Sequence, residues 1–192
     1  MSKTLTDSDF VAGGRQVNLE PSLIHAVCDV EAPNGGFDEN GLPRILFEGH
    51  QFSRLTNHVY DQSHPTISYP QWTKRFYSST NTGEHARLQE ASALNRDAAL
   101  RSASWGKFQI MGFNYQTCGF LDIQSFINAM YKDEGAHLAA FLGFVSKDRG
   151  GAMIPALREH RWADFARMYN GPDYAANKYD IKLGVAYAKY KS

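Results

Sequence analysis

The fold is decided by EPSLIHAVCDVE (residues 20–31), the APNGGF that follows it (32–37), and RILF (44–47). From Leu23 onward, apolar residues recur at i, i+4 and i+7, the pattern of an amphipathic helix. The helix must stop before Pro33, since proline cannot continue it and a glycine turn follows. RILF predicts a short strand. The stretch therefore predicts a core helix that ends at Glu31 and leads at once into a small β region.

Helical patterns fill most of the remaining chain, so the predicted fold class is mainly α (α+β). A short first helix begins at a Ser8 cap and is broken by Gly13-Gly14. Phe52 is assigned to a return strand, so strand is expected largely within residues 38–52. The polar segment 53–83 receives no assignment, although it contains several aromatic residues. The other helices are expected at 84–102, 123–131, 133–146, 152–159, 162–169 and 177–190, with a helical turn at 108–111.

Composition sets the class of protein. A length of 192 residues favours one domain over 1–192. Lys plus Arg and Asp plus Glu both number 20, and this zero net charge argues against a nucleic-acid partner. Two cysteines make no disulfide framework; Cys28 is interpreted as a small core residue, and a bridge to Cys118 has no support. No secretory signal and no apolar run of membrane-spanning length are expected.

The carboxylates suggest glycosidic chemistry. That reaction needs an acid kept protonated near neutral pH, often with a second carboxylate opposite it. Burial at the end of an apolar helix raises the pKa of a carboxyl group, and Glu31 has that position. On pattern alone, a solvated terminal Glu31 is the more common case. Glu48, at the end of the predicted strand, is the first candidate for the second carboxylate, and Asp38 in the preceding loop is the reserve.

Other candidates are polar side chains near turns. His50 would share a strand face with Glu48 if the strand continued, and the two are equally well explained as a structural pair. In SWGKFQIMG (104–112), Ser104 and Gln109 are able to hydrogen-bond a sugar, or to form an ordinary turn. YNGP (169–172) predicts a helix end. No histidine pair has metal-ligand spacing, so neither a metal nor a cofactor is expected.

Four strings in order, VCDVEAPNGGF (27–37), ILFEGHQF (45–52), SWGKFQIMGFN (104–114) and YNGP, resemble the N-acetylmuramidase family of phage endolysins. Their layout is also similar to the wider lysozyme and lytic transglycosylase superfamily. The resemblance implies a lysozyme-like two-lobed fold with Glu31 as the catalytic acid. It also implies that Gln109, Tyr169 and Asn170 hold substrate or orient the acid. It leaves the second carboxylate open.

The resemblance implies a muramidase that hydrolyses the β-1,4 bond between N-acetylmuramic acid and N-acetylglucosamine in peptidoglycan. The alternatives are a lytic transglycosylase, which needs one Glu and leaves 1,6-anhydro ends, and a wall-binding module without catalysis. The expected partner is the glycan strand, bound by a monomer through its cleft alone. Synthesis in the cytoplasm is expected, with release or export by another protein before the wall is reached.

Overall fold

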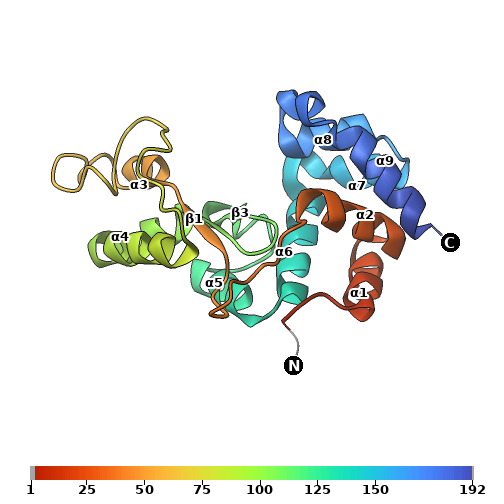
Figure 1. The fold of residues 1–192 in the computed structure, drawn as a ribbon, viewed down its shortest axis with the longest axis horizontal. Helices are drawn as coiled ribbons and strands as arrows, with labels where there is room; N and C mark the ends of the chain where they lie inside the picture. Colours follow the sequence, from red (N-terminus) through yellow and green to blue (C-terminus); the bar gives the residue numbers. More distant parts are fainter. Residues whose placement is uncertain (1–2, 192) are drawn as a thin grey trace. The chain divides into compact units, whose positions relative to one another are not determined.

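The computed structural model describes residues 3–191 and is mostly helical, with one small sheet (Figure 1). Its contacts divide the chain into two compact units. The first unit holds the residues up to Gly35, Thr117–Gly119, and the residues from Asp133 onward. The second holds Gly36–Gln116 and Phe120–Lys132. The predicted mainly helical fold is confirmed. No helix among residues 3–191 is both long enough and apolar enough to cross a membrane.

The first unit is entirely helical. Helix α2 packs against α1 and α9, α6 packs against α1 and α7, and α8 joins α7 to α9 (Figure 1). Helix α2 ends at Glu31, as predicted. The helices of the first unit are α1 (Asp7–Val17), α2 (Pro21–Glu31), α6 (Glu134–Lys147), η2 (Asp148–Gly151), α7 (Met153–Arg158), α8 (Trp162–Asn170), η3 (Pro172–Asn177) and α9 (Tyr179–Tyr190).

Helix α1 departs from the prediction at both ends. It begins after Thr6 rather than Ser8, and the Thr6 backbone N–H donates to the Asp9 carboxylate at 2.8 Å. It also runs through the two glycines predicted to break it. A Cβ on Gly14 would lie 2.6 Å from the Leu19 carbonyl oxygen, so glycine there permits a close approach of the backbone.

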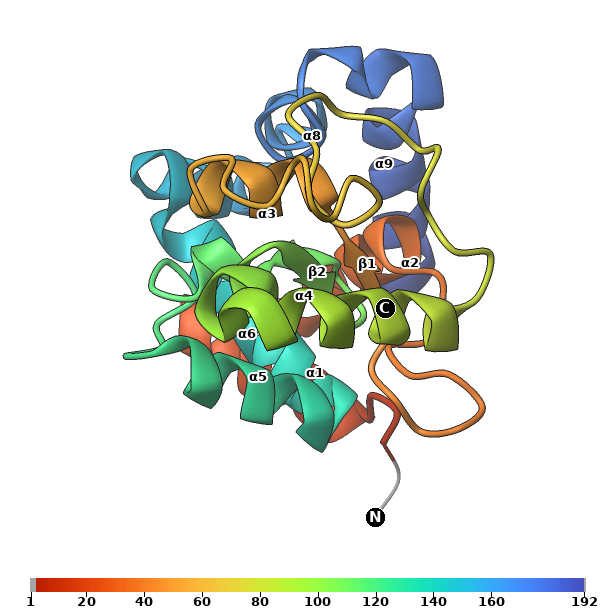
Figure 2. The same cartoon turned by 90° about the vertical axis from the view of Figure 1, so that its left-hand side faces the viewer.

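The second unit surrounds a three-stranded antiparallel sheet in the order β1-β2-β3. Ile45 pairs with Trp105, and Ser104 pairs with Met111. Helix α4 packs against β1, α3 and α5, and Figure 2 shows α3 and α4 side by side. The elements of the second unit are β1 (Ile45–Phe47), α3 (Gly49–Leu55), α4 (Asn81–Arg101), β2 (Ala103–Trp105), β3 (Ile110–Met111), η1 (Gly112–Asn114) and α5 (Ile123–Lys132).

Two predictions about strands are wrong. Phe52 lies in α3 rather than in a return strand, and residues 110–111 form β3 rather than part of a helical turn. Two of the three strands therefore lie outside residues 38–52. Gly106 (φ 69°) and Gln109 (φ 48°) adopt left-handed backbone between β2 and β3, and this tight turn folds a very short pair that periodicity does not reveal.

The two cysteines are buried and form no disulfide with each other, and the first unit contains both. Cys28 is 4% exposed within α2 and packs as the small core residue that the sequence predicts.

Candidate active site

Glu31 is the last residue of α2, and its carboxyl group is half-buried. Burial, the largest influence, raises its pKa above the ordinary 4.5, while a hydrogen bond from Asn170 and the charge of Lys182 act in the opposite direction. The Asn170 amide Nδ2 donates to Glu31 Oε1 at 2.9 Å. A solvated terminal glutamate would have neither the burial nor the partner. The structure thus places Glu31 where a carboxylic acid stays protonated to higher pH.

Asn170 and Tyr169 end α8, as the YNGP string predicts, and Gly171 follows with a φ of 83°. The Tyr169 ring stacks on Phe165 and meets Phe141 edge to face, with centroid separations of 5.8 and 5.4 Å. Burial and then the nearby Glu31 charge raise the pKa of the Tyr169 phenol. Its hydroxyl therefore keeps its proton and is able to donate a hydrogen bond.

In the second unit, Glu48 occupies the N-cap position of α3. The Tyr77 hydroxyl donates to Glu48 Oε2 at 2.6 Å, and His50 Nδ1 lies 3.2 Å from the same oxygen. The Glu48–His50 pair of the sequence analysis is present, but His50 stands on a helix and not on a strand face. Gln51 Nε2 lies 2.9 Å from the other ring nitrogen of His50.

Tyr77 was missed by the sequence analysis. It belongs to the unassigned segment 53–83, where no periodicity relates it to Glu48. Burial, followed by the hydrogen bond to Glu48 and its charge, raises the Tyr77 pKa, so the phenol stays protonated. The only signal in the sequence was the number of aromatic residues in that segment.

Close packing requires a glycine at position 49, between Glu48 and His50. A Cβ there would lie 2.5 Å from the Ile67 carbonyl oxygen and 2.3 Å from the Tyr69 ring. Glycine is thus required for the start of α3 to lie against the segment that carries Tyr69.

Asp38 is occupied within its own loop. Oδ1 accepts the backbone N–H groups of Asn40 and Leu42, and Oδ2 accepts the Asn81 amide at 2.7 Å. Burial alone would raise its pKa, but these hydrogen bonds outweigh it and the Asp38 pKa lies below its usual range. The observed contacts are those of a group that closes a loop.

Ser104 and Gln109 bond each other. Ser104 Oγ donates to Gln109 Oε1 at 2.8 Å, and Gln109 Nε2 donates to the carbonyls of Gly106 at 2.8 Å and Arg44 at 3.2 Å. Gln109 is exposed and Ser104 is buried. The pair ties the β2–β3 turn to the residue preceding β1.

The family model of N-acetylmuramidase matches residues 20–191. This chain belongs to the N-acetylmuramidase family. Membership identifies it as a peptidoglycan hydrolase. Among solved structures, it is similar to the crystal structure of Burkholderia AP3 phage endolysin, with a TM-score of 0.89 and 36% sequence identity over 98% of this chain and 71% of that one. No curated protein matches this chain.

The structure of this family member distributes the predicted residues over both units. The first contains Glu31, Tyr169 and Asn170 in mutual proximity. The second contains two separate groups, Glu48 with His50, and Ser104 with Gln109. Among residues 3–191, no group of three acidic, histidine or cysteine side chains is placed to hold a metal ion.

Proposed function

We propose that this muramidase hydrolyses the β-1,4 bond between N-acetylmuramic acid and N-acetylglucosamine, with Glu31 as the general acid. The observation that carries the proposal is the half-buried Glu31 carboxyl group, whose pKa is raised and which Asn170 holds. Glycosidic cleavage needs such an acid to protonate the leaving oxygen.

Asn170 selects the oxygen that carries the proton. Because its amide N–H donates to Oε1, that oxygen serves as the acceptor and the acidic proton belongs on Oε2. Oε2 then faces the leaving oxygen of the substrate. Tyr169 is a further donor near the carboxyl group, and it assists in holding the substrate or the acid.

For the second carboxylate we propose Glu48, with Asp38 as the reserve. Stabilising an oxocarbenium-like transition state, or activating water, requires an ionised carboxylate in a fixed position. The Tyr77 hydroxyl fixes the Glu48 carboxylate, and His50, whose Nδ1 lies 3.2 Å from the same oxygen, is a candidate substrate contact. Ser104 and Gln109 are proposed to shape the sugar-binding surface through their turn.

A second candidate activity is lytic transglycosylation. In that reaction Glu31 gives its proton to the leaving oxygen as the C1–O bond breaks, and the 6-hydroxyl of the muramic acid then attacks C1 and returns its proton to the Glu31 carboxylate. One observation favours it: Glu48 and Asp38 both accept hydrogen bonds within their own unit, as structural carboxylates do. Glu31 would then act alone.

Mass spectrometry of a sacculus digest decides between these activities. Hydrolysis is expected to leave muramic acid ends that borohydride reduces. Fragments with 1,6-anhydro ends would instead establish the transglycosylase. If intact protein sediments with sacculi but releases no soluble fragment, the protein is a wall-binding module.

A further inference from the structure

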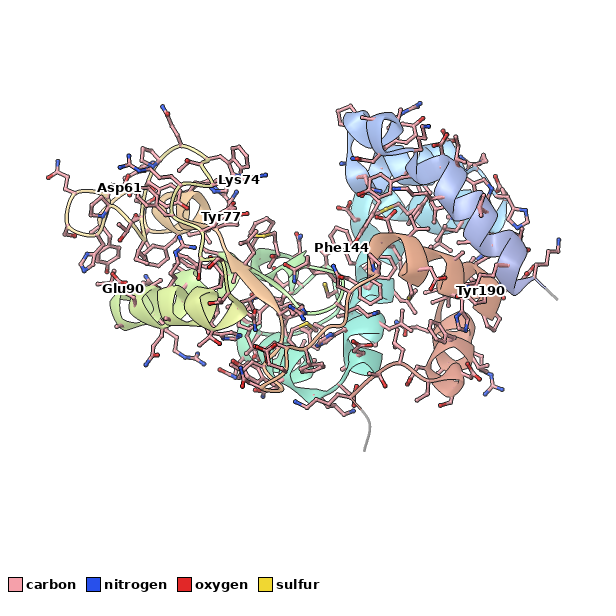
Figure 3. The ribbon with its side chains drawn as sticks, viewed as in Figure 1. Asp61, Lys74, Tyr77, Glu90, Phe144 and Tyr190 are labelled. Atoms are coloured by element: carbon pink, nitrogen blue, oxygen red, sulfur yellow. The ribbon has the colours of Figure 1, made fainter. Side chains whose placement is uncertain are left out.

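The segment Thr56–Thr80, between α3 and α4, has no helix or strand of its own, yet hydrogen bonds hold it in place. Asp61 accepts hydrogen bonds from Ser53 and Ser68, and the Tyr60 hydroxyl donates to the Leu94 carbonyl. Figure 3 shows Asp61, Lys74 and Tyr77 on this segment. Loops longer than about 12–15 residues inside compact domains usually carry function. This segment is therefore a candidate binding surface.

Trp72 is the most exposed aromatic side chain of this segment, at 60%. It lies five residues before Tyr77, whose hydroxyl donates to Glu48 Oε2 at 2.6 Å. The Arg87 guanidinium lies 6.0 Å from the Tyr77 ring centroid and is held by the buried Glu84. Fixed contacts therefore hold Tyr77, close to Trp72 in the sequence, against Glu48 and Arg87.

The charged residues next to Trp72 in the sequence all have one sign. Residues 70–80, PQWTKRFYSST, include Lys74 and Arg75 and no acidic residue. Both cations are exposed, with Lys74 Nζ 5.8 Å from the Trp72 ring centroid and Arg75 over the Phe76 ring. Among the described residues, no carboxylate forms an ion pair with either cation. The surface presents a flat apolar ring beside two available positive charges.

We propose that Trp72, Lys74 and Arg75 form a subsite for a pyranose ring with a carboxylate close by, as peptidoglycan supplies through its peptide-bearing muramic acid. Because the Trp72 side chain is 60% exposed, its ring face is accessible to bury the apolar C–H face of a sugar. The two cations pair with the peptide carboxylates. The subsite deepens the proposed function and rests on it.

The binding experiment uses Glu31→Gln protein, which leaves the saccharide intact. The probes are purified disaccharide–tetrapeptide fragments and the uncharged N-acetylglucosamine trimer. The tryptophan indole N–H signals are followed by NMR, and loss of a signal in Trp72→Phe assigns Trp72. We expect the Trp72 signal to move with both probes. A Trp72 signal that stays fixed at saturation overturns the subsite.

Variants separate stacking from charge. Trp72→Ala is expected to weaken binding of both probes about tenfold, whereas Trp72→Phe retains affinity within about threefold because a ring remains. Lys74→Gln with Arg75→Gln should weaken only the acidic probe and reduce the salt dependence of its binding. The control is Leu121→Ala, at a side chain in the same unit that is 93% exposed. If Trp72→Phe loses about tenfold in affinity, the loss expected of Trp72→Ala, the stacking role is overturned. This test of Trp72→Phe remains valid even if the alanine variant unfolds.

The subsite and the proposed function fail in different ways. If Trp72→Ala binds like the Leu121 control while wild-type protein cleaves the glycan, the subsite is overturned and the function stands. If the Trp72 signal moves with both probes while wild-type protein cleaves no glycan, the subsite stands and the function is overturned.

Discussion

At the scale of single residues, the proposed reaction depends on how two candidate glutamates are held, each within its own unit. Glu31 is desolvated and receives one neutral amide donor, a setting that favours the protonated acid. Glu48 receives a phenol donor and lies beside an imidazole, a setting suited to a fixed carboxylate. Two glutamates in such different surroundings can take the roles of acid and base in one reaction.

The raised pKa of Glu31 makes stability depend on pH. A carboxyl group whose folded pKa exceeds its unfolded value favours folding most below about pH 4.5, and this contribution is lost as pH rises through the folded pKa. Glu31→Gln has no such loss. We therefore expect the Tm of Glu31→Gln minus that of wild type to increase between pH 4 and pH 7. A Tm difference that is constant over this range would contradict the burial of an ionisable Glu31.

The role of Glu48 is tested with the Glu48→Gln variant and with two tyrosine variants. Glu48→Gln is expected to lower kcat about 100-fold. Tyr77→Phe, which removes the donor to Glu48, is expected to lower it less, by about tenfold or below. Tyr60→Phe is the matched control, since its hydroxyl bonds the Leu94 carbonyl instead. Full activity of folded Glu48→Gln would remove Glu48 from the mechanism and move the second role to Asp38 or to none.

At the scale of elements, glycines decide how closely helices approach their neighbours. A Cβ on Gly143, in α6, would lie 2.2 Å from the Cys118 carbonyl oxygen. A Cβ on Gly184, in α9, would meet only the Trp162 ring at 3.4 Å. The same substitution in two helices of one unit should therefore act in opposite directions.

Gly143→Ala is expected to destabilise the protein by about 1–3 kcal/mol, because backbone must move to admit the methyl group. Gly184→Ala is expected to be neutral or to stabilise by about 0.5–1 kcal/mol, because alanine loses less entropy in a helix. Urea unfolding of both variants measures the two values. Equal effects would show that α6 does not lie against Cys118 as described.

The β2–β3 turn provides a second element-scale test. Gln109→Ala removes three hydrogen bonds, so we expect the turn to loosen and the free energy of unfolding to fall by about 1–2 kcal/mol. Activity should fall with it, because the turn shapes the proposed sugar-binding surface. If the specific activity of the folded fraction is unchanged, the role of Gln109 is purely structural.

The sequence was most informative where elements are long and periodic. The end of α2 at Glu31 and the end of α8 at Asn170 both follow from apolar spacing and from the Pro and Gly that come next. β3 has two residues, too few to show a period. Phe52 lies in helix α3, which begins at Gly49, where the lack of a Cβ leaves room for the Tyr69 ring. The contact of Tyr77 with Glu48 could not be predicted, since contacts between distant residues in an irregular segment leave no local pattern.

At the scale of the whole molecule, the family match and the two-unit organisation agree with the predicted lysozyme-like fold. The first unit contains the proposed acid Glu31 with its amide and phenol neighbours. The second contains the candidate carboxylate Glu48, the β2–β3 turn and the segment that carries Trp72. The chain thus contains the side chains that the proposed reaction needs, with each cluster fixed within its own unit.

The central claim is that Glu31 is the catalytic acid, and the rate at which Glu31→Gln releases soluble fragments from purified sacculi tests it most directly. Circular dichroism matching wild type establishes that the variant is folded, and the isosteric amide keeps an acceptor for Asn170. We predict a rate about 10²–10⁴-fold below wild type, since glutamine has no proton to give. Folded Glu31→Gln that releases fragments at a rate near wild type would contradict it.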